Sequence, residues 1–263
     1  MTNKGIEICG PINRQSSIDG AMRIDILAFG AHPDDVELFA GGTLAKMASR
    51  GYATAIVDLT RGELGTRGTP AIRAQEAREA ARILGLKVRE NLRFPDGRIG
   101  VTTKAQLGVI RVLRKYRPEI VLVHHWDDKH PDHVNTSILV TQAAHHSGLA
   151  KIKTGQERFR PKRILYFKVP ANEPLTFVVD VSDFAAQRLA AIQAYKSQLF
   201  DASSVEPETE LSRPSFPSRI ENIHKYYGAL IGTALGEGFY TKAMIEIADP
   251  VDFFRNQSDP TLR

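Results

Sequence analysis

The chain alternates between short runs of β-branched and aliphatic residues and longer segments whose apolar residues recur every three or four positions. Ile26–Gly30 predicts a buried strand, and residues 36–49 predict a helix after it. Thr69 followed by Pro70 is typical of an N-cap with proline in the first turn, and predicts a helix that runs to about Leu84. This alternation indicates an α/β fold, a Rossmann-like and mostly parallel sheet flanked by helices in a single domain. The other expected elements are strands at 54–59, 120–124, 163–167, 177–181 and 243–247, helices at 105–116, after His133, at 189–199 and at 220–231, and a short segment at 91–94.

Two polar stretches interrupt the pattern. Residues 1–22 lack periodicity and end just before the first strand, so we expect a flexible N-terminal extension without a catalytic role. Residues 201–217 contain three prolines and predict a mobile loop that borders the functional site. Residues 23–263 form the one expected domain.

Composition narrows the possible chemistry. With a single cysteine, Cys9, in 263 residues, an internal disulfide and a thiolate-rich zinc site are both excluded, so a metal would need histidine and carboxylate ligands. No stretch has the roughly 20 apolar residues of a membrane-spanning helix, and no signal-peptide pattern opens the chain, which predicts a soluble cytoplasmic protein with no membrane partner. The net charge of +5 comes from Lys and Arg scattered among acids, which favours small anionic ligands over nucleic acid.

A histidine and two carboxylates directly follow the first predicted strand, in the sequence Gly-Ala-His-Pro-Asp-Asp at residues 30–35. Open α/β sheets bind ligands at this carboxyl end of their strands. The adjacent carboxylates of Asp34 and Asp35 repel each other, and a divalent metal beside His32 would compensate for that repulsion. The alternative interpretation is that the two aspartates only cap the following helix.

A second cluster follows the strand predicted at 120–124. Four of the eight histidines lie within residues 124–133, among three aspartates. If the two strands are near neighbours, both clusters meet in one crevice and offer the two-histidine, one-carboxylate set of catalytic zinc sites. The alternative is a solvated polar loop with one or two capping residues. For His124 and His125 we expect packing at the strand end or a place behind the metal ligands.

The glycine-rich segment 61–69 could bind phosphate through backbone N–H groups, but it has neither the GxGxxG nor the Walker spacing. Glycines that permit tight turns near a ligand are the favoured interpretation. No GxSxG elbow and no HExxH motif occur in the sequence. A non-catalytic module that binds a sugar or nucleotide in the crevice, without a metal, is the contrasting hypothesis.

Two motifs in combination resemble the LmbE-like, or PIG-L, N-acetylglucosaminyl deacetylase family: Ala-His-Pro-Asp-Asp at 31–35 and His-Pro-Asp-His at 130–133. The similarity extends from about residue 25 to the carboxyl terminus, and is greatest to the branch that acts in bacillithiol biosynthesis. It implies a zinc-dependent hydrolase that removes the N-acetyl group of an N-acetylglucosamine derivative, N-acetylglucosaminyl malate. Another N-acetyl amino sugar, such as chitobiose, is the alternative substrate.

The resemblance also implies a role for each matching residue. The family pattern assigns zinc ligation to His32, Asp35 and His133. Asp34 matches the general base of the family. A site of this kind also accepts Fe²⁺ or another divalent ion, and the resemblance implies a homo-oligomer such as a hexamer.

Four further positions match family residues around the metal. His130 matches the residue that stabilises the oxyanion and protonates the leaving amine. Asp132 matches the residue that orients a neighbouring histidine from behind the metal ligands. Arg73 and Asp96 match positions that contact the sugar or its appended group.

Overall fold

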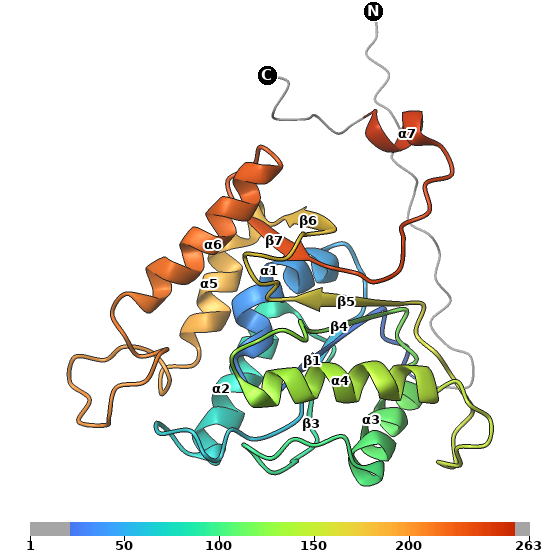
Figure 1. Cartoon of the computed structure of the whole chain (residues 1–263). Helices are drawn as coiled ribbons and strands as arrows, with labels where there is room; N and C mark the ends of the chain where they lie inside the picture. The colour runs from blue at the N-terminus through green and yellow to red at the C-terminus, as the bar shows by residue number, and fades with distance from the viewer. Residues whose placement is uncertain (1–21, 256–263) are drawn as a thin grey trace, which may run out of the picture.

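A parallel sheet forms the centre of the protein in a computed structural model that describes residues 22–255 (Figure 1). Its strand order is β3-β2-β1-β4-β5, and every pair is parallel. The expected single α/β domain is thereby confirmed. The extension predicted at residues 1–22 lies, except for Met22, outside the described residues. The strands are β1 (Ile26–Gly30), β2 (Thr54–Asp58), β3 (Val88–Asn91), β4 (Ile120–His124) and β5 (Arg163–Phe167).

Helices cover both faces of the sheet (Figure 1). Alternate residues of β1 point to opposite faces: Ile26 and Ala28 belong to one apolar core, and Leu27 and Phe29 to the other. Both cores are buried, which explains why the central strands are apolar throughout rather than alternating with polar residues. On the first face lie α1 (Asp35–Ser49), α2 (Pro70–Leu84) and α5 (Ala185–Gln193), and on the second lie α3 (Thr103–Tyr116) and α4 (Pro131–His146).

A small antiparallel sheet of β6 (Phe177–Asp180) and β7 (Gly236–Phe239) lies beside α6 (Phe216–Leu230). The prediction of a strand at 243–247 is wrong, because the last described strand ends at Phe239. A Cβ on Gly236 would lie 2.5 Å from Val178 Cγ1, so close packing requires glycine in this strand. Its sequence consequently lacks the apolar alternation that predicts strands. The remaining elements are η1 (Ser182–Phe184) and α7 (Pro250–Phe254).

Several element boundaries differ from the prediction by a few residues. The Thr69 side chain accepts a hydrogen bond from Ile72 N and caps α2, as expected. In contrast, α4 begins at Pro131 and so includes His133, and α5 ends at Gln193 instead of continuing to residue 199. The helix predicted at 220–231 begins earlier, at Phe216.

The third strand lies three residues before the segment predicted at 91–94. The charged residues of β3 break its apolar pattern, since the side chain of Arg89 is buried and pairs with buried acids of other elements. Its guanidinium contacts Asp58 at 2.8 and 2.9 Å, Glu37 of α1, and the Tyr195 hydroxyl at 2.9 Å. A buried ion pair of this kind interrupts the apolar pattern from which strands are predicted.

The order of the strands determines where a ligand can bind. After β1 the chain enters α1 on one face of the sheet, whereas after β4 it enters α4 on the opposite face. Because β1 and β4 are neighbours, the two loops diverge at the carboxyl ends of these strands, which is where open α/β sheets bind ligands. Both histidine and aspartate clusters lie on these two loops and in the first turns of the helices that follow them.

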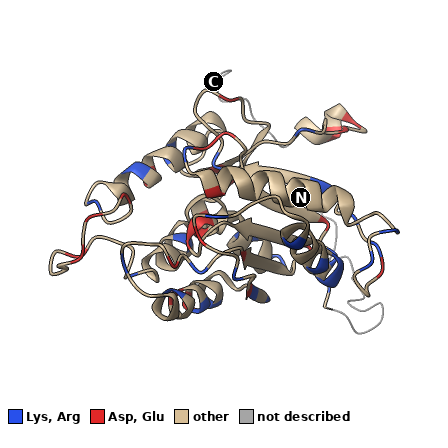
Figure 2. Cartoon of the chain, turned by 60° about the horizontal axis from the view of Figure 1, so that its bottom comes forward, with Lys and Arg blue, Asp and Glu red and all other residues tan. Residues whose placement is uncertain are grey.

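Charged residues are distributed over the described part of the chain. Lys and Arg occur on many elements and are interspersed with Asp and Glu (Figure 2). Between residues 22 and 255, no helix combines the length and the apolarity needed to cross a membrane.

Candidate metal centre and active site

The three residues predicted as metal ligands lie together at the carboxyl ends of β1 and β4. Asp35 Oδ1 is 3.2 Å from His133 Nε2, and Asp35 Oδ2 is 3.5 Å from His32 Nδ1. One ligand atom from each residue lies within 4.8 Å of the others, and Asp35 and His133 are buried. Two imidazole nitrogens and a carboxylate at this spacing match the donors that zinc and related divalent ions prefer.

Asp35 is charged in this setting. Burial acts to raise its pKa, but the adjacent His133 and His124 outweigh that effect and hold the pKa well below its usual value. Asp35 is also the first residue of α1, where the helix dipole stabilises a negative charge, and its Oδ2 accepts a hydrogen bond from the His32 backbone N at 2.8 Å. The carboxylate is therefore held in place as an anion.

Carboxylates orient both imidazoles from the side away from Asp35. His133 Nδ1 lies 3.2 Å from Asp128 Oδ2, while His32 Nε2 lies 3.0 Å from Asp96 Oδ1 and 3.4 Å from Asp132 Oδ2. Such partners fix the orientation of a ligating histidine and increase its basicity. Asp132 lies where the expected orienting residue would lie, with His32 as the histidine it contacts.

Three further residues lie around the predicted metal ligands, although the sequence predicted no role or only a general one for them. Lys168, just after β5, lies 2.7 Å from Asp128 Oδ2 and 3.0 Å from His133 Nδ1. His124 is buried, stacks on His133 with ring centroids 4.1 Å apart, and places Nε2 3.2 Å from Asp35 Oδ2. Asp128 could have been found from its place in the second cluster, whereas Lys168 gives no local signal because another strand brings it to the site.

We expect Asp128→Asn to weaken zinc binding by roughly 10- to 100-fold, the usual cost of losing a partner behind a metal ligand. The amide keeps the size of the carboxylate but loses the charge that faces His133 and Lys168. Chelator competition measures the affinity, and Asp127→Asn, on the exposed neighbouring residue, is the matched control. Equal zinc affinity in the two variants would show that Asp128 does not support the metal.

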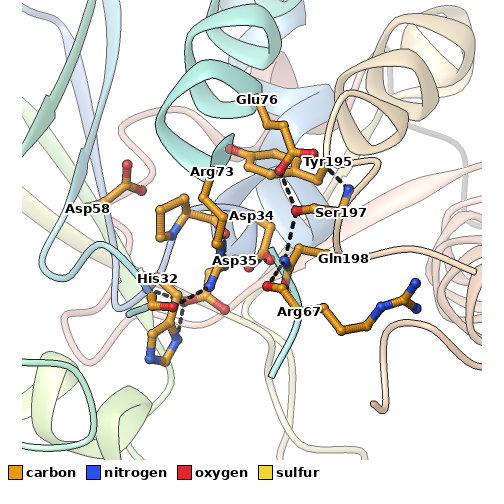
Figure 3. A network of polar contacts seen from close by, with 12 residues as sticks. His32, Asp34, Asp35, Asp58, Arg67, Arg73, Glu76, Tyr195, Ser197 and Gln198 are labelled. Carbon is orange, nitrogen blue, oxygen red and sulfur yellow. Dashed lines mark hydrogen bonds and ion pairs between the residues drawn. The ribbon is translucent and has the colours of Figure 1, made fainter. Parts of the chain in front are cut away.

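Asp34 lies beside the ligands but has different surroundings (Figure 3). It is buried, and burial raises its pKa to about 7 even though the Arg73 guanidinium acts in the opposite direction. Arg73 Nη2 donates to Asp34 Oδ2 at 2.9 Å. A carboxylate with a pKa near neutrality can both accept and release a proton, as a general base must.

His130 lies at the edge of the site as the N-cap of α4. Its Nδ1 accepts a hydrogen bond from Asp132 N at 3.2 Å, so the neutral ring carries its proton on Nε2. Loss of hydration lowers the pKa of His130, as do the neighbouring His133 and His32. The ring centroid is 4.9 Å from that of His32. A neutral His130 can thus donate a hydrogen bond from Nε2 to an oxygen of a molecule bound beside it.

The two residues expected to touch substrate contact protein groups in this structure. Arg73 is buried against Asp34, and Asp96 Oδ2 accepts a hydrogen bond from Leu64 N at 2.8 Å. Burial would raise the pKa of Asp96, but the hydrogen bonds from His32 and the Leu64 backbone lower it to about 2. Their role in substrate recognition stays a prediction.

Known proteins match the part of the chain that carries these site residues. Residues 27–144 match the PIG-L family model, described as GlcNAc-PI de-N-acetylase. YaiS, an uncharacterized deacetylase of Escherichia coli (strain K12), is 30% identical over 185 residues, which cover 66% of this chain and 92% of that protein. The structure of the conserved protein TT1542 from Thermus thermophilus is 37% identical, with a TM-score of 0.76, and covers 86% of this chain and 98% of that one. The chain belongs to the PIG-L family.

A further relative of this PIG-L protein has a named substrate. The diacetylchitobiose deacetylase of Thermococcus kodakarensis is 28% identical over 225 residues, 81% of each chain. The named relatives are deacetylases, which hydrolyse C–N bonds, so the chain is an enzyme of this hydrolase class. The resemblance found in the two sequence motifs is confirmed.

Proposed function

We propose that this PIG-L protein is a metal-dependent deacetylase that removes the acetyl group from an N-acetylglucosamine derivative. The observation that supports it best is the convergence of His32, Asp35 and His133 beside buried Asp34. Carboxylates hold the outer nitrogens of both histidines, as they do at metal sites in proteins. Zn²⁺ is the proposed ion, and Fe²⁺ also suits this donor set.

Water alone hydrolyses an amide very slowly, so the reaction needs a stronger nucleophile than water and a polarised amide carbonyl. When bound, the metal would supply Lewis acidity and lower the pKa of the attacking water to about 7. Asp34 accepts the proton of that water as a C–O bond forms at the acetyl carbon. His130 donates a hydrogen bond from Nε2 to the developing oxyanion. The C–N bond then breaks as the nitrogen receives a proton from Asp34 or through His130, and acetate and the free amino sugar leave.

For the substrate we propose N-acetylglucosaminyl malate, on the strength of the resemblance to the bacillithiol branch. The named relative that acts on diacetylchitobiose supports a second candidate from the same chemical class. The homo-oligomer implied by the resemblance stays a prediction.

Acetate release from three substrates tests the function. The purified enzyme, loaded with Zn²⁺, is given N-acetylglucosaminyl malate, N-acetylglucosamine and diacetylchitobiose, before and after removal of the metal by a chelator. We expect release that depends on the metal and is fastest with the malate derivative. A protein that binds these sugars without a metal and releases no acetate would instead be the non-catalytic module, and the proposed function would be wrong.

A further inference from the structure

Asp34 has a backbone conformation that requires support. Its φ of 112° is one that residues with a side chain rarely adopt, and it makes no capping hydrogen bond to α1. Arg73 contacts both the side chain of this residue and the peptide before it, because Nη2 lies 2.9 Å from Asp34 Oδ2 and 2.6 Å from the Pro33 carbonyl oxygen. One guanidinium nitrogen thus fixes the side chain and the preceding peptide together.

The Arg73 guanidinium is enclosed by protein. Arg73 is only 4% exposed, and Nη1 donates to the Gly62 carbonyl oxygen at 3.3 Å. Burial of this extent leaves no exposed face on which a substrate carboxylate could form a bidentate ion pair.

The glycine-rich segment 61–69 makes room for this guanidinium. A Cβ on Gly62 would lie 1.8 Å from Arg73 Nη1, and one on Gly65 would lie 3.3 Å from it. Gly62 also has a φ of 66°, which favours glycine. Thr60 connects the segment to the metal-binding loop, since its Oγ1 donates to the Ala31 carbonyl and accepts from Gly62 N. The glycines therefore have a specific steric task beside Asp34.

Contacts from α2 keep Arg73 in place (Figure 3). One turn further along the helix, Glu76 accepts hydrogen bonds from Ser197 N and Ser197 Oγ, both at 2.7 Å. Gln198, the residue after Ser197, donates from Nε2 to the Arg67 carbonyl oxygen at 2.8 Å and so binds the glycine-rich segment as well. Ser197 and Gln198 thus anchor both the helix that carries Arg73 and the segment before it.

We propose that Arg73 is a positioning residue, whose guanidinium holds the Asp34 carboxylate and its strained peptide in the geometry needed for proton transfer. The proposal rests on the proposed function, in which Asp34 is the base. It gives Arg73 a task in turnover that is independent of the charge of the substrate, and it gives Gly62 the task of leaving space for the guanidinium.

Arg73→Ala separates positioning from substrate contact. A misplaced catalytic group costs about 10²-fold in rate, so we expect kcat to fall by about that factor on neutral N-acetylglucosamine and on anionic N-acetylglucosaminyl malate alike. KM and zinc content should change little, and millimolar guanidinium chloride should restore part of kcat. A rise in KM confined to the malate derivative, with kcat preserved, would instead show that Arg73 binds the anionic group and would overturn the proposal.

Gly62→Ala provides a second test that keeps the arginine and decides the question if Arg73→Ala does not fold. Its matched control is Gly51→Ala, because Gly51 also has a positive φ, of 85°, but a Cβ there meets nothing within 4 Å. Both variants carry backbone strain, and only Gly62→Ala displaces the guanidinium. We expect kcat to fall only in Gly62→Ala, and equal kcat in both variants would overturn the proposal.

Failure of the positioning role can be distinguished from failure of the proposed function. If the wild type releases no acetate from any of the substrates, or if Asp34→Asn keeps the wild-type kcat, the proposed function or its base is wrong. If Asp34→Asn loses kcat while Arg73→Ala and Gly62→Ala keep it, only the positioning role is wrong. In the Asp34→Asn background, Arg73→Ala should cause little further loss, because the two residues act as one unit.

Discussion

Asp34→Asn should keep near-stoichiometric zinc while kcat falls by about 10²- to 10⁴-fold, the usual contribution of general-base catalysis. The amide cannot accept the proton of water, whereas the predicted ligands His32, Asp35 and His133 remain unchanged. The amide oxygen would still accept a hydrogen bond from Arg73 Nη2, so the arginine keeps a partner. Loss of rate without loss of metal is the signature that separates a base from a ligand.

Zinc content and acetate release must be measured on the same preparation of Asp34→Asn. Removing one charge of a buried ion pair destabilises a protein, so circular dichroism should confirm that the variant is folded at the assay temperature. Asp183→Asn, a change of the same type at an exposed position, is the control. Full activity in folded Asp34→Asn would exclude Asp34 from the mechanism.

Local sequence predicted most of the central fold because the signals were short-range. The strand Ile26–Gly30 and the Thr69 cap depend on apolar runs and on hydrogen bonds within one turn, and both are confirmed. The strand β7 could not be predicted in the same way. Its two glycines are required by close contact with Val178 and Leu175, which lie some sixty positions earlier in the chain. An element whose composition is set by a distant neighbour has no local pattern.

The candidate site likewise contains residues that the sequence could place and contacts that it could not. His32, Asp35 and His133 could be placed together on the condition that their two strands are near neighbours, because parallel strands present their carboxyl ends on one edge. The structure meets that condition, since β1 pairs with β4. The contact of Lys168 with Asp128 depends on which strand lies next to β4, which the sequence does not show. The contact of Arg73 with Asp34 likewise depends on how α2 packs.

The two neighbouring aspartates have different electrostatic environments. Nearby histidines hold the pKa of Asp35 well below its usual value, despite burial, whereas burial raises that of Asp34 to about 7. Environments that move two carboxyl groups in opposite directions are typical of sites where one group stays charged and the other exchanges protons. This difference predicts opposite outcomes for matched substitutions.

Asp35→Ala should lose both zinc and activity. The carboxylate lies 3.2 Å from His133 Nε2 and from His124 Nε2, so its removal leaves imidazoles without the anion that faces them. Because Asp35 offers a ligand atom itself, we expect zinc affinity to fall by more than the roughly 10- to 100-fold expected for a partner behind a ligand. Acetate release should fall to background even when zinc is added at the concentration that saturates the wild type.

Asp35→Asn is the matched control for this prediction, because the amide can still accept the hydrogen bond from the His32 backbone N. It preserves the shape of the loop and removes only the charge, so a similar loss of zinc in both variants would assign the effect to ligation rather than to a collapsed loop. Zinc content after gel filtration, chelator competition and acetate release on each preparation measure the three quantities. An Asp35→Ala variant that keeps its metal and its rate would show that Asp35 is not a ligand, and the division of tasks between the two aspartates would be wrong.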